Sequence, residues 1–137
     1  MAYDAALAAE TRDWFQKARD DLEAAQRLLS GTPPLVAVAA FHTQQAAEKA
    51  MKGFLTWYGE IFRKIHSLIE IGEACVKLDP GLAEISSRVA PISGWAVETR
   101  YPGEWSSPGD AEVARALDTV RELFRAILSR LPDEIGL

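Results

Sequence analysis

The sequence has only one cysteine, Cys75, in 137 residues. A single thiol cannot close an internal disulfide, and no second Cys or His stands at the spacing of a zinc site. The sequence therefore excludes a disulfide-stabilised scaffold and predicts no metal and no cofactor. Cys75 follows Leu68 and Ile71 at helical spacing, so we interpret it as a core thiol.

A long hydrophobic run is also missing. No stretch approaches the roughly 20 apolar residues that a membrane-spanning helix needs. The first residues, Met1–Asp4, lack the basic start and apolar segment of a signal peptide. We therefore expect a soluble, cytoplasmic protein without a membrane partner.

Positive charge is in deficit, with 15 Lys and Arg against 20 Asp and Glu and a formal net charge of −5. Such a chain has no overall attraction to a phosphate backbone, so we expect no nonspecific nucleic-acid binding. A chain of this length folds most simply as one domain, residues 1–137, which buries roughly two-thirds of its unfolded surface.

Alternation of apolar and polar residues is absent as well, and apolar residues instead recur every three or four positions. This pattern predicts an all-α fold, an up-and-down helical bundle of four main helices plus one short helix. The helices are expected over about residues 8–30, 33–59, 68–78, 80–89 and 108–131. Pro91 and Gly94 predict a kink or break near Val89.

Several helix starts carry recognisable capping residues. Ser67 and Glu70 have the form of a capping box, and Asp79 followed by proline both ends one helix and caps the next. Thr32 and Ser107 each precede a proline, which predicts that they cap the second and the last main helix. The few residues between the first two helices predict an antiparallel hairpin.

The second helix carries a polar stripe on an otherwise apolar and alanine-rich segment. Its members recur at i, i+3, i+7 and i+10 and so share one helical face: His42, Gln45, Lys49 and Lys52. Such a face can line a ligand-binding groove. Two other interpretations stay open: His42 as a partly buried histidine bonded to a neighbouring helix, and Lys52 as half of a surface ion pair with Glu48.

A second candidate segment, Thr99–Gly103, contains Arg100 and Tyr101 in a turn shaped by proline and glycine. An arginine fork can bind phosphate, and a tyrosine ring can stack on a base. The alternative is a structural corner. His66 precedes the capping Ser67 and could instead hold the start of that helix.

Common catalytic and phosphate-binding motifs are missing. The sequence has no glycine-rich phosphate loop, no dinucleotide fingerprint and no hydrolase triad. Its paired carboxylates, Asp20–Asp21 and Asp133–Glu134, are interpreted as solvated surface groups.

Four segments, in this order, resemble a prokaryotic HEPN domain, the "higher eukaryotes and prokaryotes nucleotide-binding" family. They are Trp14, Ala18, Asp21, Leu22, Ala25, Leu28 and Leu29 in the first helix, Phe41–Ala50 in the second, His66-Ser67-Leu68, and Thr99-Arg100-Tyr101-Pro102. Together they extend over nearly the whole chain. The resemblance implies a helical bundle that is frequently a homodimer and often pairs with a minimal nucleotidyltransferase in a toxin–antitoxin-like system.

The resemblance also implies a tentative nucleotide-binding site. Its positions here are His42, Gln45, Lys49, Lys52, His66, Arg100 and Tyr101, and Glu48 is a further position that matches a family motif. Many members are metal-independent ribonucleases that use an arginine followed four to six residues later by a histidine. This sequence departs from that pattern, since Arg63 lies only three residues before His66.

Three functions therefore compete. The first is a non-catalytic module that binds a nucleotide or a nucleotidyltransferase. The second is a ribonuclease with a non-standard site such as His42, Lys49 and Arg100. The third is a structural homodimerisation bundle whose polar stripe is an interface.

Overall fold

The computed structural model describes residues 4–62, 64–65, 67–99, 102–103 and 107–135. Its helices are α1 (Ala5–Leu29), α2 (Val36–Trp57), α3 (Leu68–Leu78), α4 (Ala83–Val89), α5 (Trp95–Glu98) and α6 (Asp110–Leu128). Single 3₁₀ turns occupy Pro80–Leu82, Ala90–Ile92 and Asp133–Ile135. No strand occurs in these ranges, so the predicted all-α helical bundle is confirmed.

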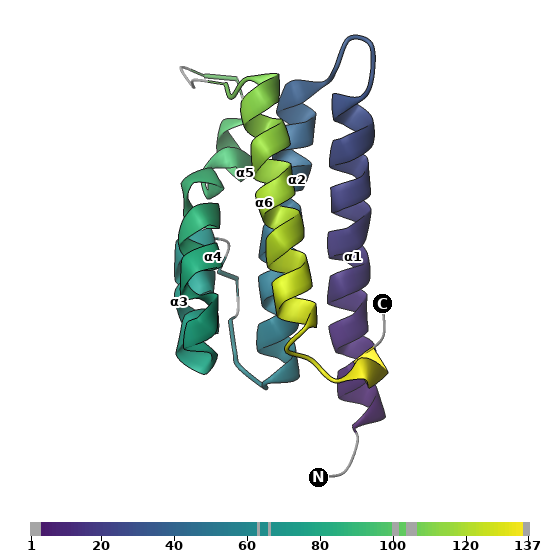
Figure 1. Ribbon diagram of the computed structural model, residues 1–137, viewed down its shortest axis with the longest axis vertical. Helices are drawn as coiled ribbons and strands as arrows, with labels where there is room; N and C mark the ends of the chain where they lie inside the picture. The colour runs from purple at the N-terminus through teal and green to yellow at the C-terminus, as the bar shows by residue number, and fades with distance from the viewer. Residues whose placement is uncertain (1–3, 63, 66, 100–101, 104–106, 136–137) are drawn as a thin grey trace.

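The helices pack side by side in one bundle (Figure 1). α1 and α2 form the predicted antiparallel hairpin, and both described chain ends lie at the end of the bundle opposite the hairpin loop. After α2 the link back to α3 runs along the bundle, so α2 and α3 point in the same direction. α4 then reverses the direction and α6 reverses it again. This returning link passes beside α2, which bears on the site described below.

The capping residues of α1, α3 and the first 3₁₀ turn act through their side chains. Asp4 accepts a hydrogen bond from the Leu7 amide at 3.0 Å. Ser67 accepts one from the Glu70 amide at 3.5 Å, as the capping-box pattern predicts. Asp79 ends α3 and accepts from the Gly81 amide at 2.9 Å.

Two other predicted caps are wrong. α2 begins at Val36 with Leu35 as its cap, not at Thr32, and the Leu35 amide donates instead to the Leu28 carbonyl of α1. α6 begins at Asp110 rather than at Pro108. The backbone stays extended through Gly109, whose carbonyl accepts the first helical bond, from Val113.

The break predicted in the fourth helix is confirmed. α4 ends at Val89, and a 3₁₀ turn that contains Pro91 follows directly. Proline has no N–H to donate and its ring crowds the preceding turn, so a regular α-helix cannot continue through it. Only the short helix α5, from Trp95 to Glu98, forms beyond it.

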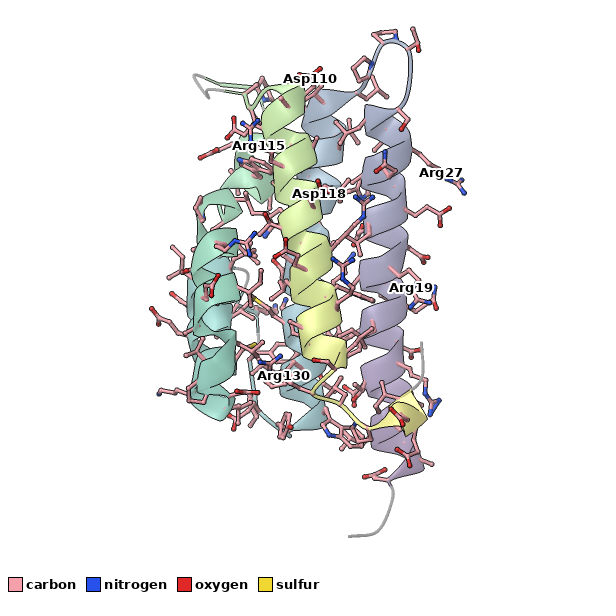
Figure 2. All side chains as sticks on the ribbon, viewed as in Figure 1. Arg19, Arg27, Asp110, Arg115, Asp118 and Arg130 are labelled. Atoms are coloured by element: carbon pink, nitrogen blue, oxygen red, sulfur yellow. The ribbon has the colours of Figure 1, made fainter. Side chains whose placement is uncertain are left out.

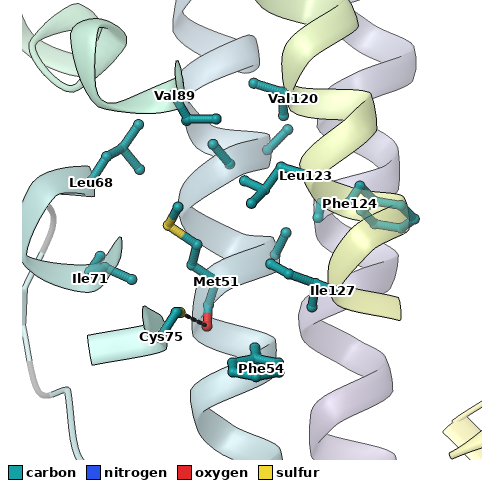
Figure 3. Close-up of a cluster of buried hydrophobic side chains, with 14 of the residues drawn as sticks. Met51, Phe54, Leu68, Ile71, Cys75, Val89, Val120, Leu123, Phe124 and Ile127 are labelled. Atoms are coloured by element: carbon teal, nitrogen blue, oxygen red, sulfur yellow. Dashed lines mark hydrogen bonds between the residues drawn. The ribbon is translucent and has the colours of Figure 1, made fainter. Parts of the chain in front are cut away.

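The core lies between α1, α2, α3, α4 and α6, and a close-up shows part of it (Figure 3). Its close-up view shows Met51 of α2 facing Leu68 and Ile71 of α3 on one side and Leu123 of α6 on the other. Toward α1 the packing is tighter. A Cβ atom at Gly53 would lie 2.8 Å from a Phe15 ring carbon, so a glycine lets the two helices of the hairpin approach.

Charged side chains cover the outside of the bundle (Figure 2). Arg19 and Arg27 point away from α1, whereas Arg130 at the end of α6 forms an ion pair with Asp79 after α3. The Gly81 amide and Arg130 hold the pKa of the Asp79 carboxyl below its usual range. This contact ties the C-terminal end of α6 to the junction between α3 and α4.

Cys75 is a core thiol, as predicted, and its Sγ donates to the Met51 carbonyl at 3.7 Å (Figure 3). Burial raises the pKa of this thiol from 9.0 to about 12. Between those values the unfolded chain loses the thiol proton and the native chain keeps it, so stability falls as pH rises from 9 toward 12.

We therefore expect two results for Cys75. The native protein at pH 8 should react with a disulfide reagent far more slowly than the protein in denaturant, because the neutral buried thiol is a poor nucleophile. Urea midpoints should decrease more between pH 9 and pH 10.5 in the wild type than in Cys75→Ala. Rapid modification of the native protein would contradict the assignment of Cys75 to the core.

Candidate functional site

The polar stripe of α2 is only partly open to solvent. His42, Gln45 and Lys49 are half-buried, and Lys52 is buried. At the N-terminal end of the stripe, His42 contacts Asp21 of α1. At its C-terminal end, Lys52 is covered by Trp14 of α1 and by Phe62 of the link to α3. The residues predicted from the stripe thus fall into two groups.

The first group is held together by Asp21 of α1. Its carboxylate lies 2.7 Å from Nδ1 of His42 and accepts a hydrogen bond from Nζ of Lys49 at 2.6 Å. The Asp21 side chain is 9% exposed, against 29% for His42 and 24% for Lys49. A buried carboxylate therefore fixes two side chains that still reach solvent.

Asp21 is the residue that our sequence interpretation misplaced. We assigned it to the solvated surface, but it is buried in the contact between α1 and α2. The signal was its spacing: it lies three residues after Ala18 and four before Ala25, and both alanines are fully buried. A carboxylate on the buried face of α1 needs hydrogen-bond partners from another helix. α2 supplies two of them, His42 and Lys49.

The contact also fixes the state of the His42 ring. A carboxylate paired with a lysine only accepts hydrogen bonds, so Nδ1 carries the proton that Asp21 receives. When the ring is neutral, this tautomer presents a lone pair at Nε2. Within the described part of the chain no hydrogen bond engages Nε2. The interpretation of His42 as a histidine bonded to a neighbouring helix is confirmed.

The second group is a buried polar network. Lys52 donates to Glu48 at 3.1 Å, and both side chains are 5% exposed. Nε2 of Gln44 lies 3.4 Å from Glu48, and Gln45 donates to Gln44 at 2.7 Å. The predicted ion pair between Glu48 and Lys52 therefore forms, but in the interior of the bundle and not on its surface.

Two aromatic rings also contact the Lys52 ammonium group. Nζ lies 5.7 Å from the centre of the Trp14 ring and 5.6 Å from that of Phe62. The two rings meet edge to face at 5.8 Å. Cation–π contacts of this kind compensate part of the lost hydration, so Lys52 belongs to the interior of the bundle.

The remaining predicted positions, His66, Arg100 and Tyr101, lie outside the described residues. The segment before them is described: Thr99 ends α5, and its hydroxyl donates to the Trp95 carbonyl. α5 packs on α2. The chain therefore enters the Thr99–Gly103 segment next to the helix that carries the stripe.

A hollow of about 530 Å³ lies elsewhere, between α3 and α4. Its walls are mainly apolar and include Ile69, Val76, Ala83 and Ala90. α3 and α4 carry none of the stripe residues. The volume of this hollow therefore gives no support to a site at the polar stripe of α2. We place the candidate site at Asp21, His42 and Lys49 because partly exposed polar groups converge there.

Two further properties concern the described ranges only. No three His, Cys, Asp or Glu side chains gather there as metal ligands do. No helix in the same ranges is long and apolar enough to cross a membrane.

Among the comparisons with known proteins, a family profile identifies this chain. The profile of the HEPN domain matches residues 11–131. The crystal structure of TT1696 from Thermus thermophilus is similar in fold, with a TM-score of 0.70 and 27% sequence identity, and the match covers 88% of this chain and 98% of that one. No curated protein matches with significance.

Proposed function

Because the chain belongs to the HEPN domain family, we propose that it is a binding module that holds a nucleotide and pairs with a minimal nucleotidyltransferase. The two would form a toxin–antitoxin-like pair. The site on this chain would comprise His42, Gln45 and Lys49, joined by Arg100 and Tyr101, which follow α5 in the sequence.

The observation that carries the proposal is the placement of His42 and Lys49 by one buried carboxylate. Lys49 uses one N–H on Asp21 and has two more to donate. Nε2 of His42 can accept a hydrogen bond. A donor and an acceptor side by side match a nucleotide, whose phosphate oxygens accept and whose ribose hydroxyls donate. Because Asp21 fixes both side chains in advance, little side-chain entropy is lost on binding.

A nucleotidyltransferase partner is supported by the family. The test is co-expression with a small nucleotidyltransferase encoded beside this chain, followed by size-exclusion chromatography. We expect one co-eluting complex. Separate elution of two folded proteins would contradict the pairing and leave nucleotide binding to be tested by the titrations described below.

The family resemblance also leads us to expect a homodimer. Large apolar side chains remain exposed on the single chain, namely Leu35, Val38, Tyr58, Ile61, Ile69, Leu78 and Val97. Burying some of them between two copies would be favourable. Light scattering on the purified protein at tens of micromolar should give twice the chain mass of 15.1 kDa. A single-chain mass would contradict the expectation and weaken the dimerisation-bundle alternative as well.

A second candidate function is a ribonuclease, which the contact between Asp21 and His42 favours. A histidine oriented by a carboxylate is a suitable general base for a ribose hydroxyl, and Lys49 could stabilise the phosphate. Two features weigh against it: the family's arginine-to-histidine spacing is absent, and the chain is acidic.

We therefore expect no metal-independent cleavage of single-stranded RNA by the purified protein. The measurement is incubation of labelled RNA with increasing protein and chelator. Concentration-dependent cleavage that disappears in His42→Ala, but persists in His66→Ala, would contradict this and establish the ribonuclease function instead.

A further inference from the structure

His42 has one ring nitrogen committed inside the hairpin and one directed away from that contact. Nδ1 faces the buried Asp21 carboxylate at 2.7 Å, and the side chain is 29% exposed. We propose that Nε2 of His42 is a phosphoryl-acceptor site, at which the histidine takes a phosphoryl group from a reactive donor such as a phosphoramidate or an acyl phosphate.

The Asp21 carboxylate orients the His42 imidazole and makes its Nε2 the nucleophilic atom. It keeps the proton on Nδ1, so the lone pair stands at Nε2, and it stabilises the positive charge that the ring acquires when Nε2 forms a bond. The ring is also held in place, since Phe41 meets it edge to face at 5.3 Å between ring centres. Orientation of this kind lowers the entropy cost of the reaction.

Lys49 supplies the charge that the incoming group needs. Its ammonium binds the other oxygen of the same carboxylate, at 2.6 Å, so Asp21 holds nucleophile and cation together. The two remaining N–H groups of Lys49 can bind phosphoryl oxygens. For this role the inference rests on the proposed function, which assigns Lys49 to a phosphate.

The step balances without a metal or an oxidant. With phosphoramidate as donor, the Nε2 lone pair forms a bond to phosphorus while the bond from phosphorus to the donor nitrogen breaks. The donor nitrogen leaves with its protons as ammonia. The Nδ1 proton stays on the ring, which is now positively charged and faces Asp21. With an acyl phosphate the leaving group is a carboxylate.

The chain offers a sharp test because it has only two histidines. Purified protein is incubated with potassium phosphoramidate, and the phosphoryl group is followed by intact mass and by ³¹P NMR before and after mild acid. The variants are His42→Gln, His66→Gln as the matched control, Asp21→Asn and Lys49→Gln, each checked for retained helicity and melting temperature.

We expect one acid-labile phosphoryl group on the wild type and none on His42→Gln, whereas a group that persists on His42→Gln but is lost from His66→Gln would place the acceptor at His66 and overturn the proposal. Asp21→Asn should react about tenfold more slowly, by analogy with the 10–100-fold losses seen when the carboxylate behind a metal-binding histidine is removed. Lys49→Gln should also react more slowly. If Asp21→Asn does not fold, the rate of Lys49→Gln alone tests whether the groups around His42 assist the reaction.

Labelling of His42→Gln at the wild-type rate would overturn the proposal, and so would wild-type rates in both folded Asp21→Asn and Lys49→Gln. Nucleotide titration without a phosphoryl donor tests the proposed function separately. A protein that binds nucleotide but takes no phosphoryl group refutes this inference alone, whereas one that is labelled but binds no nucleotide refutes the proposed function alone.

Discussion

Lys52→Met should lower the free energy of unfolding by about 3–5 kcal/mol, and Glu48→Leu should have a similar effect. Each leaves a charged partner in the bundle interior, where both side chains are 5% exposed. Breaking a buried ion pair from one side typically has this cost, because the remaining charge stays desolvated and loses the attraction of the opposite charge in that pair. Urea denaturation followed by circular dichroism gives the values.

The double variant Glu48→Leu/Lys52→Met should regain most of the lost stability, since both members of the buried ion pair are then removed together. Glu23→Gln is the matched control. It breaks the ion pair with Arg27 at the same i, i+4 spacing, but on the surface, and should cost less than about 0.5 kcal/mol. Equal effects of Lys52→Met and Glu23→Gln would mean that Lys52 is solvated.

Arg100→Ala should weaken nucleotide binding by about ten- to a hundredfold. If Arg100 forks onto a phosphate of the bound nucleotide, its loss removes charge-assisted hydrogen bonds worth roughly 1.5–3 kcal/mol. Glu112→Ala, on the exposed side of α6, should leave the affinity almost unchanged. Calorimetric titration of the three proteins measures the difference.

Equal affinity in the wild type and Arg100→Ala would remove this arginine from the site. The Thr99–Gly103 segment would then be a structural corner, and the site would be reduced to the side chains on α2. The alternative of a structural homodimerisation bundle would be favoured only if Lys49→Gln also bound the nucleotide with wild-type affinity.

The helices of this bundle are largely determined by local rules that are visible in the sequence. Apolar spacing located the long helices, and the proline after Ala90 marked the end of α4. The starts of α2 and α6 were harder to predict, because contacts beyond the local sequence decide them. The Leu35 amide, for instance, donates to α1 and not to a local side chain.

Only the part of the candidate site that lies on α2 could be predicted from the sequence. The periodicity of α2 placed His42 and Lys49 on one face, but their common partner comes from α1, 28 residues before Lys49. Burial of Lys52 was not visible either. Its depth depends on Trp14 and on Phe62 in the returning link, and the path of that link is a property of the assembled fold.

We propose that Lys49, fixed by Asp21, holds the phosphate of a nucleotide. The decisive measurement is calorimetric titration of wild type and Lys49→Gln with a panel of purine and pyrimidine mono-, di- and triphosphates. We expect saturable binding of at least one nucleotide by the wild type and at least about tenfold weaker binding by folded Lys49→Gln. No binding across the panel, or equal affinity in both proteins, would contradict it.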